Sequence, residues 1–219
     1  MSSTSEDYLK RILAESRRNG EELVSLGYIA ESSKVTQGTV TTMMQSLADS
    51  GFVEYLPRRG VKLTPLGREN ATRMLRRHRL IELFLVEILQ LDWSEVHTEA
   101  EILEHAVSDR FVDRIDEILN HPTLDPHGDP IPTADGNIME SSSRPLSDAV
   151  VTGAYRISRI TNDEPDFLDF IKAKDLVPGR SIQVSERDAD AGTIRIGVKG
   201  NDVTLSLGVA GRILVDFNE

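Results

Sequence analysis

The segment 97–105, HTEAEILEH, concentrates side chains that could bind metal ions. It contains two imidazoles and three carboxylates within nine positions. A solvated helix commonly places Lys or Arg four residues from its carboxylates, where the pairs are stabilising, and neither residue occurs in this segment. Because Glu104 and His105 lie three and four residues after Glu101, a helix would place the three side chains on one face, with His97 one turn earlier.

A second pair with the same chemistry precedes this segment. His78 and Glu82 are four residues apart in a stretch of helical periodicity. Two neighbouring helices could therefore bring together three imidazoles and three carboxylates, which is an N/O donor set for one or two divalent first-row metal ions. A single residue of this set is more often a surface or core residue than a ligand. Two such groups beside a DNA-binding pattern favour the metal interpretation.

The elements that would position these groups begin with a winged helix-turn-helix pattern. Apolar residues at helical spacing predict helices over residues 5–19 and 26–33. Thr36 can cap a third helix, which would end at Gly51. Two short β-type runs, FVEYL and VKLT, flank PRRG, and this order predicts a hairpin with a basic tip.

The third helix and the hairpin tip carry side chains suited to DNA. Thr and Gln can contact phosphates and base edges, and Arg can contact phosphates or a minor groove. The candidate residues are Thr36, Gln37, Thr39, Thr41, Thr42, Arg58 and Arg59. Threonines opposite an apolar stripe also occur on ordinary amphipathic helices, so the interpretation depends on the adjacent hairpin. Few of these side chains can make bidentate base contacts, which indicates much indirect readout.

The charge distribution agrees with this division. The whole chain carries a net charge of −11, but residues 1–77 carry +3 and residues 78–219 carry −14. Such asymmetry suggests that one module faces a polyanion and another faces cations.

The rest of the chain predicts a helical middle and a β-rich end. We expect a long helix over 65–90, two more over 93–107 and 109–120, and then a Pro/Gly/Ser/Asp-rich loop. IQVSE, TIRIGVK, VTLSLG and RILVDF alternate like short strands around a helix near 166–174, which fits a small β-barrel. The fold class is mainly α with small β. The expected divisions are a DNA-binding domain over 1–74, a helical metal-binding domain over 75–138, a linker over 139–150, and a small β-barrel domain over 151–219.

Composition excludes several classes of protein. The chain has no cysteine, hence no disulfide framework, thiolate metal site or cysteine nucleophile. It has no apolar run of membrane-spanning length, and its N-terminus lacks the pattern of a signal peptide. We therefore expect a cytoplasmic protein with no membrane partner.

Several stretches together carry a family resemblance. They are SEDYL, VTQGTVTTMMQSLADSGFV, LTPLGRENA, RRHRLIELFL, VHTEAEILEHAVSD and GDPIP, and the spaced His and Glu residues within them are the most specific feature. With these stretches the chain resembles the diphtheria toxin repressor family of metal-dependent transcriptional regulators over nearly its whole length. The C-terminal domain matches only loosely.

The resemblance implies a homodimeric repressor that binds a palindromic double-stranded operator when loaded with Mn(II) or Fe(II), two ions per subunit. It also implies a ligand set. Asp7, Glu101, Glu104 and His105 would form the primary site, and His78, Glu82 and His97 the neighbouring site. By the same resemblance the domain over 75–138 would also mediate dimerisation, and the domain over 151–219 would be SH3-like. That SH3-like domain would add Asp163 and Asp166 from NDEPDF. No small organic ligand is expected.

Departures from the family pattern indicate which metal ion to expect. Iron-type members carry Met and Cys where this chain has Asp7 and Glu101, whereas manganese-type members carry Asp and Glu. The compact manganese regulators lack a third domain, however, and have Glu where this chain has Lys10. Oxygen donors in place of sulfur favour Mn(II), so we expect Mn(II), with Fe(II) as the alternative.

Two other classes of function compete with this interpretation. A carboxylate-bridged di-metal enzyme would use Glu-x-x-His on paired helices, and that spacing does not occur here. The H-E-x-x-H, G-x-S-x-G and phosphate-loop motifs are also absent from the sequence. A winged-helix regulator that senses an organic ligand would bind its operator equally well in the presence of a chelator.

Overall fold

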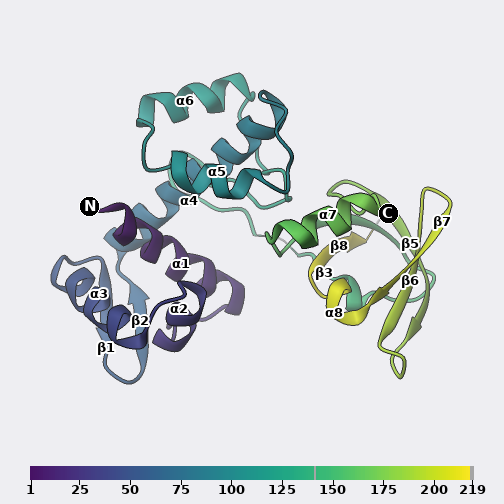
Figure 1. Cartoon of the computed structure of the whole chain (residues 1–219), viewed down its shortest axis with the longest axis horizontal. Coiled ribbons are helices and arrows are strands. Elements are labelled where there is room, and N and C mark those ends of the chain that lie inside the picture. The colour runs from purple at the N-terminus through teal and green to yellow at the C-terminus, as the bar shows by residue number, and fades with distance from the viewer. Residues whose placement is uncertain (141, 218–219) are drawn as a thin grey trace. The chain divides into compact units, whose positions relative to one another are not determined.

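The N-terminal unit folds around three helices and a hairpin. The computed structural model describes residues 1–140 and 142–217. Contacts divide the chain into one compact unit of Met1–His78 with Pro132–Asn137 and another of Arg79–Ile131 with Ile138–Glu219. The first contains α1 (Ser3–Asn19), α2 (Leu26–Ser32), α3 (Gln37–Asp49), β1 (Val53–Leu56) and β2 (Gly60–Leu63) (Figure 1).

Local signals explain where these helices begin and end. Ser2, Ser25 and Thr36 each accept a hydrogen bond from the backbone N–H three residues later, which satisfies a donor that the first helical turn leaves open. Gly20 ends α1 in the left-handed conformation, with φ +68°. The predicted winged helix-turn-helix is confirmed, and its core consists of apolar residues that include Leu9, Ile12, Leu13, Ile29, Val40, Met44, Val53 and Val61.

The hairpin packs closely on the start of the long helix. β1 and β2 pair antiparallel, and Val24 adds a bridge to Val61. The helix α4 runs over Pro65–Glu87, three residues shorter than expected. A Cβ atom on Gly67 would lie 1.9 Å from the Phe52 carbonyl oxygen, so only glycine permits this approach.

The second unit begins with a helical part. The end of α4, α5 (Val96–Leu103) and α6 (Asp109–Ile118) enclose a core that includes Leu80, Leu85, Val96, Ala100, Val112 and Ile115. The predicted helix over 93–107 is shorter in the structure, because Glu104 caps it and residues 104–106 form a turn. Trp93 precedes α5 and packs into the core of the C-terminal fold instead.

In the described part of the chain, the C-terminal fold is built on a six-stranded sheet. The order β3-β8-β4-β5-β6-β7 is antiparallel throughout. Its elements are β3 (Arg144–Pro145), η1 (Leu146–Asp148), β4 (Ala154–Ile160), α7 (Pro165–Ala173), β5 (Ser181–Asp188), β6 (Thr193–Val198), β7 (Asn201–Ser206), α8 (Leu207–Ala210) and β8 (Ile213–Phe217) (Figure 1). The sheet and helix predicted for this end of the chain are confirmed.

Two features of this region differ from expectation. β4 was not among the predicted strands, because AYRISRI alternates imperfectly and the pairing shifts by a bulge between Ile157 and Arg159. The expected linker over 139–150 is part of the fold at its C-terminal end, where β3 pairs with β8 and Leu146 is fully buried. No helix within the described residues is long and apolar enough to cross a membrane.

Candidate metal centre and DNA-binding surface

The end of α5 places a buried carboxylate next to an imidazole. Glu104 follows the last residue of α5, and its backbone N–H still donates to the Ala100 carbonyl at 2.9 Å. Its side chain is 0% exposed, and its Oε1 lies 3.5 Å from Nε2 of His105. Burying a carboxylate is costly unless hydrogen-bond donors or a cation compensate it. The pair therefore offers oxygen and nitrogen donors where positive charge is stabilising.

His97 on α5 is surrounded by carboxylates. Its Nδ1 lies 3.1 Å from Oε1 of Glu82 on α4, and its Nε2 lies 3.9 Å from Oε1 of Glu101. The same Nε2 lies 3.4 Å from Oδ2 of Asp163, in the segment before α7. Residues from α4, α5 and the C-terminal fold thus meet at one imidazole. Such a group of donors suits a divalent cation.

A further group was not predicted from the sequence. Glu82, Asp125 and His127 are all buried, and one ligand atom from each lies within 4.8 Å of the others. His127 Nε2 lies 3.3 Å from the Trp93 carbonyl oxygen, and its Nδ1 lies 4.0 Å from Oε2 of Glu82. When Nε2–H donates to that carbonyl, the lone pair of Nδ1 is directed to the carboxylate side. This is the usual arrangement of a metal-ligating histidine, whose other nitrogen is held by a backbone or carboxylate oxygen.

The loop that carries Asp125 and His127 is held by its own hydrogen bonds. Oδ1 of Asp125 accepts from the backbone N–H groups of His127 and Asp129 at 2.8 and 2.9 Å. Burial raises the pKa of the Asp125 carboxyl well above its ordinary value, and the carboxylates of Asp129 and Glu82 raise it further, against the opposing effect of Arg79. A nearby cation would favour the ionised form of Asp125.

This loop also docks on the C-terminal fold. The His127 carbonyl accepts from the Ile160 N–H at 2.9 Å, and Oδ1 of Asp129 pairs with Arg79 and Arg159 at 2.8 and 2.5 Å. A Cβ atom on Gly128 would lie 2.0 Å from the Ser158 carbonyl oxygen. The close approach requires glycine, and it joins the loop to β4 as well as to α4.

Asp7, His78 and Asp166 complete the set of predicted ligands. Asp7 is half-buried on α1, and His78 is buried on α4, one turn before Glu82; both belong to the N-terminal unit. Asp166 is exposed in the first turn of α7, whereas Asp163 is next to His97. The membership of all nine predicted ligands in metal sites stays a prediction.

The predicted DNA contacts are mostly exposed side chains of the N-terminal unit. The side chains of Thr36, Gln37, Thr39 and Thr42 are exposed around the start of α3, and that of Thr41 is half-buried. The Thr41 and Thr42 hydroxyls donate to helix carbonyls four residues earlier, at 2.8 and 3.1 Å. Arg58 and Arg59 are exposed at the hairpin tip, where Arg58 adopts φ +65°. That conformation is uncommon for a residue with a side chain.

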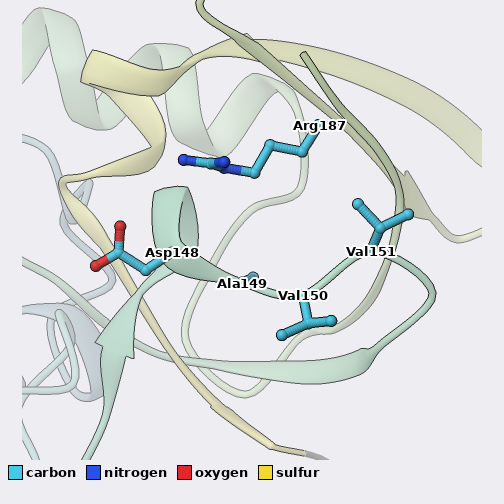
Figure 2. A pocket seen from close by; sticks show the side chains of 5 residues that line it. All are labelled: Asp148, Ala149, Val150, Val151 and Arg187. Atoms are coloured by element: carbon cyan, nitrogen blue, oxygen red, sulfur yellow. The ribbon is translucent and has the colours of Figure 1, made fainter. Parts of the chain in front are cut away.

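A surface hollow in the C-terminal fold has a different character. It is lined by Asp148, Ala149, Val150, Val151 and Arg187 (Figure 2). Nε of Arg187 donates to the Ser147 carbonyl at 2.9 Å. The lining supplies one carboxylate and no imidazole, so this hollow lacks the donor set found around His97.

Three family models match successive parts of the chain. One described as iron dependent repressor, N-terminal DNA binding domain, matches residues 1–61. One described as iron dependent repressor, metal binding and dimerisation domain, matches 64–133, and the FeoA domain matches 144–216.

Individual relatives match over most of their length. The diphtheria toxin repressor of Corynebacterium diphtheriae is 31% identical over 191 residues, which is 81% of each chain. The iron-dependent repressor IdeR of Mycobacterium leprae is 28% identical over 201 residues, 86% of each. A solved structure titled manganese-dependent transcriptional repressor complex with manganese has a TM-score of 0.89 at 37% identity, covering 98% of this chain and 100% of that one.

A winged helix-turn-helix, a helical domain with buried carboxylate–imidazole groups and an SH3-like domain together define a metal-dependent transcriptional repressor. The chain belongs to the diphtheria toxin repressor family. That family consists of DNA-binding regulators and not enzymes, so the di-metal enzyme is set aside.

Proposed function

We propose that this repressor is activated by Mn(II), with Fe(II) as the alternative effector. The observation that carries the proposal is that Glu82, Glu104 and Asp125, each at most 7% exposed, all lie beside imidazoles. The donors are oxygen and nitrogen, and the sequence contains no cysteine. Hard oxygen ligands suit Mn(II) better than soft sulfur does. The 37% identity to a manganese-dependent repressor supports the same choice.

Two ions per subunit would use two donor sets. The primary set is Asp7, Glu101, Glu104 and His105, and the second is His78, Glu82 and His97. To the second set we add Asp125 and His127, because both lie beside Glu82. The 3.4 Å separation of Asp163 from His97 favours Asp163 over Asp166 as the contribution of the C-terminal fold. A bound ion would supply the positive charge that keeps these buried carboxylates ionised.

Dimerisation is supported by apolar side chains that the second unit leaves exposed. They lie just after α4 and on α5 and α6, and they are Ile88, Leu89, Leu91, Ile102, Phe111 and Ile118. An exposed group of this kind is typical of a protein–protein contact. A symmetric dimer would present two α3 helices to the half-sites of a palindromic operator, one helical turn apart.

The proposed coupling depends on the position of Asp7. This residue belongs to α1 of the DNA-binding unit, whereas Glu101, Glu104 and His105 belong to the second unit. A site shared by them would make metal and operator favour the same arrangement of the chain. Each ligand would then raise the affinity for the other by the same factor.

An operator titration tests the proposed function. Palindromic duplexes of about 30 base pairs, long enough for two half-sites one turn apart, are selected from a random pool with the Mn(II)-loaded chain. Binding to the selected duplex is then measured against Mn(II), Fe(II) under anaerobic conditions, and Zn(II), with a chelated sample as control. We expect Mn(II) to activate at the lowest concentration. Activation by Fe(II) alone would select the alternative, and equal binding in chelator would refute metal control.

A further inference from the structure

Lys10 lies inside the N-terminal unit against one of the predicted ligands. It is on the inner face of α1, and it is only 8% exposed although lysine is seldom buried. Its Nζ lies 3.5 Å from Nδ1 of His78 on α4, and His78 is 5% exposed. The contact is therefore a buried one between two helices of the same unit.

The chemistry of this contact limits what His78 can bind. A lysine ammonium has three donors and no acceptor, so in a hydrogen bond between these two groups Nδ1 of His78 supplies the lone pair. A neutral imidazole that accepts at Nδ1 carries its proton on Nε2. Neither ring nitrogen then has a lone pair to offer a metal ion. The ammonium also places a full positive charge beside the position that the ion would occupy.

We propose that Lys10 competes with divalent ions for His78. This inference rests on the proposed function, since it assumes that the chain binds Mn(II). While Lys10 contacts Nδ1, His78 is held out of coordination, and the ions bind through the other donors. An ion gains His78 as a ligand only when it displaces the ammonium. Lys10 thereby sets the concentration of divalent ion at which His78 becomes a ligand.

The test compares Mn(II) binding by full-length variants. Electron paramagnetic resonance of the free ion measures the binding. Lys10→Met removes the charge and the donors but keeps an unbranched apolar stem. We expect it to tighten the weakest class of Mn(II) sites by about tenfold, the effect of losing one hydrogen bond to a charged group. Lys34→Met, at an exposed position in the same unit, is the matched control and leaves the isotherm unchanged. Lys10→Arg retains the charge and stays close to the unsubstituted chain.

A second comparison identifies the route. With His78→Ala as background, adding Lys10→Met produces no further gain if the competition acts through His78. An unchanged isotherm for Lys10→Met would overturn the inference, and so would a gain that persists without His78. If Lys10→Met does not fold, as judged by circular dichroism, Lys10→Gln makes the same comparison. Failure of the unsubstituted chain to bind Mn(II) would instead refute the proposed function.

Discussion

Asp7 is the residue at which metal binding and signalling can be separated. It is the one proposed primary ligand on α1, and the other three belong to the second unit. We expect Asp7→Ala to retain most of the Mn(II) affinity, because Glu101, Glu104, His105 and the second donor set remain. The metal-induced gain in operator affinity, about 1–3 kcal/mol for such couplings, should largely disappear.

Calorimetry and operator binding on the same Asp7→Ala sample measure the two quantities. Glu21→Ala, at an exposed loop position in the same unit, controls for the loss of one negative charge. Equal losses in both measurements would show that Asp7 is an ordinary ligand with no role in joining the units.

Glu15 makes a pH-dependent contribution within the DNA-binding unit. Its burial raises the pKa, but hydrogen bonds from Arg18, Tyr28 and Asn19 outweigh that effect, and the pKa is lowered overall. Because the folded pKa lies below the unfolded one, this contribution is present above the unfolded pKa of about 4.3 and is lost as the pH falls through the folded value.

Substitution of Glu15 tests the direction of this effect. Glu15→Gln should lower the free energy of unfolding by about 1 kcal/mol near neutral pH. The difference from the unsubstituted chain should shrink as the pH is lowered towards 3. Thermal unfolding in chelator, followed by circular dichroism, measures this. A difference that is constant with pH would mean that the Glu15 charge does not stabilise the fold.

Among the elements, the hairpin and α3 have different expected roles in DNA binding. Arg58 and Arg59 at the hairpin tip suit phosphate contacts, which add affinity for every sequence and depend on salt. Replacing both with Ala should weaken binding to every duplex and reduce the salt slope of that binding by about 1 to 2. Replacing Gln37 or Thr39 on α3 should instead alter the preference among half-site sequences.

Binding measured across salt concentration on matched and mismatched duplexes distinguishes these roles. Arg114→Ala, an exposed arginine on α6 of the other unit, is the control for lost positive charge. If the salt slope is unchanged in the double Arg variant, the hairpin tip does not contact the DNA phosphates.

The loop 125–130 packs against both α4 and β4. Gly128 is the position that permits its close approach to β4. Gly128→Ala should displace the loop and weaken metal binding by Glu82, Asp125 and His127. The only tryptophan of the chain, Trp93, reports on this, because its ring stacks on His127 at 5.3 Å between centroids. The metal-induced change in Trp93 fluorescence should fall in Gly128→Ala.

Gly179→Ala provides a matched control for that substitution. Gly179 has φ +84° where Gly128 has φ +85°, but no atom lies within 4 Å of its added Cβ. Both variants carry the same backbone cost, and only Gly128→Ala adds the clash. Identical fluorescence responses in the two variants would show that the loop does not position the metal ligands.

The loop 125–130 shows which features could not be predicted from the sequence. Helices with Ser or Thr caps, apolar periodicity and a glycine end were predictable because those signals are local, and so was the hairpin. DPHGDPIP has the composition of a connecting loop, and the contacts that make Asp125 and His127 candidate ligands come from α4 and Trp93, distant in sequence. A histidine within a Pro/Gly-rich stretch was the one available signal. β4 was missed because its alternation breaks at a bulge.

At the scale of the whole molecule, charge and ligands are divided between the two units. Residues 1–77 carry +3 and the remainder carries −14. A basic DNA-binding unit and an acidic remainder favour approach of DNA to one part of the chain only. The acidic remainder also holds most of the proposed ligands, so binding of divalent cations would reduce its negative charge. Both effects would link metal binding to DNA binding.

The most direct test of this linkage is the Mn(II) affinity of the full-length chain with and without saturating operator duplex, measured by calorimetry at fixed salt. We predict that the operator tightens Mn(II) binding by the same factor by which Mn(II) tightens operator binding, since the coupling of two ligands is reciprocal. A scrambled duplex of equal length should produce a much smaller change. An Mn(II) affinity that is identical with operator, with scrambled duplex and without DNA would contradict control of this repressor by metal.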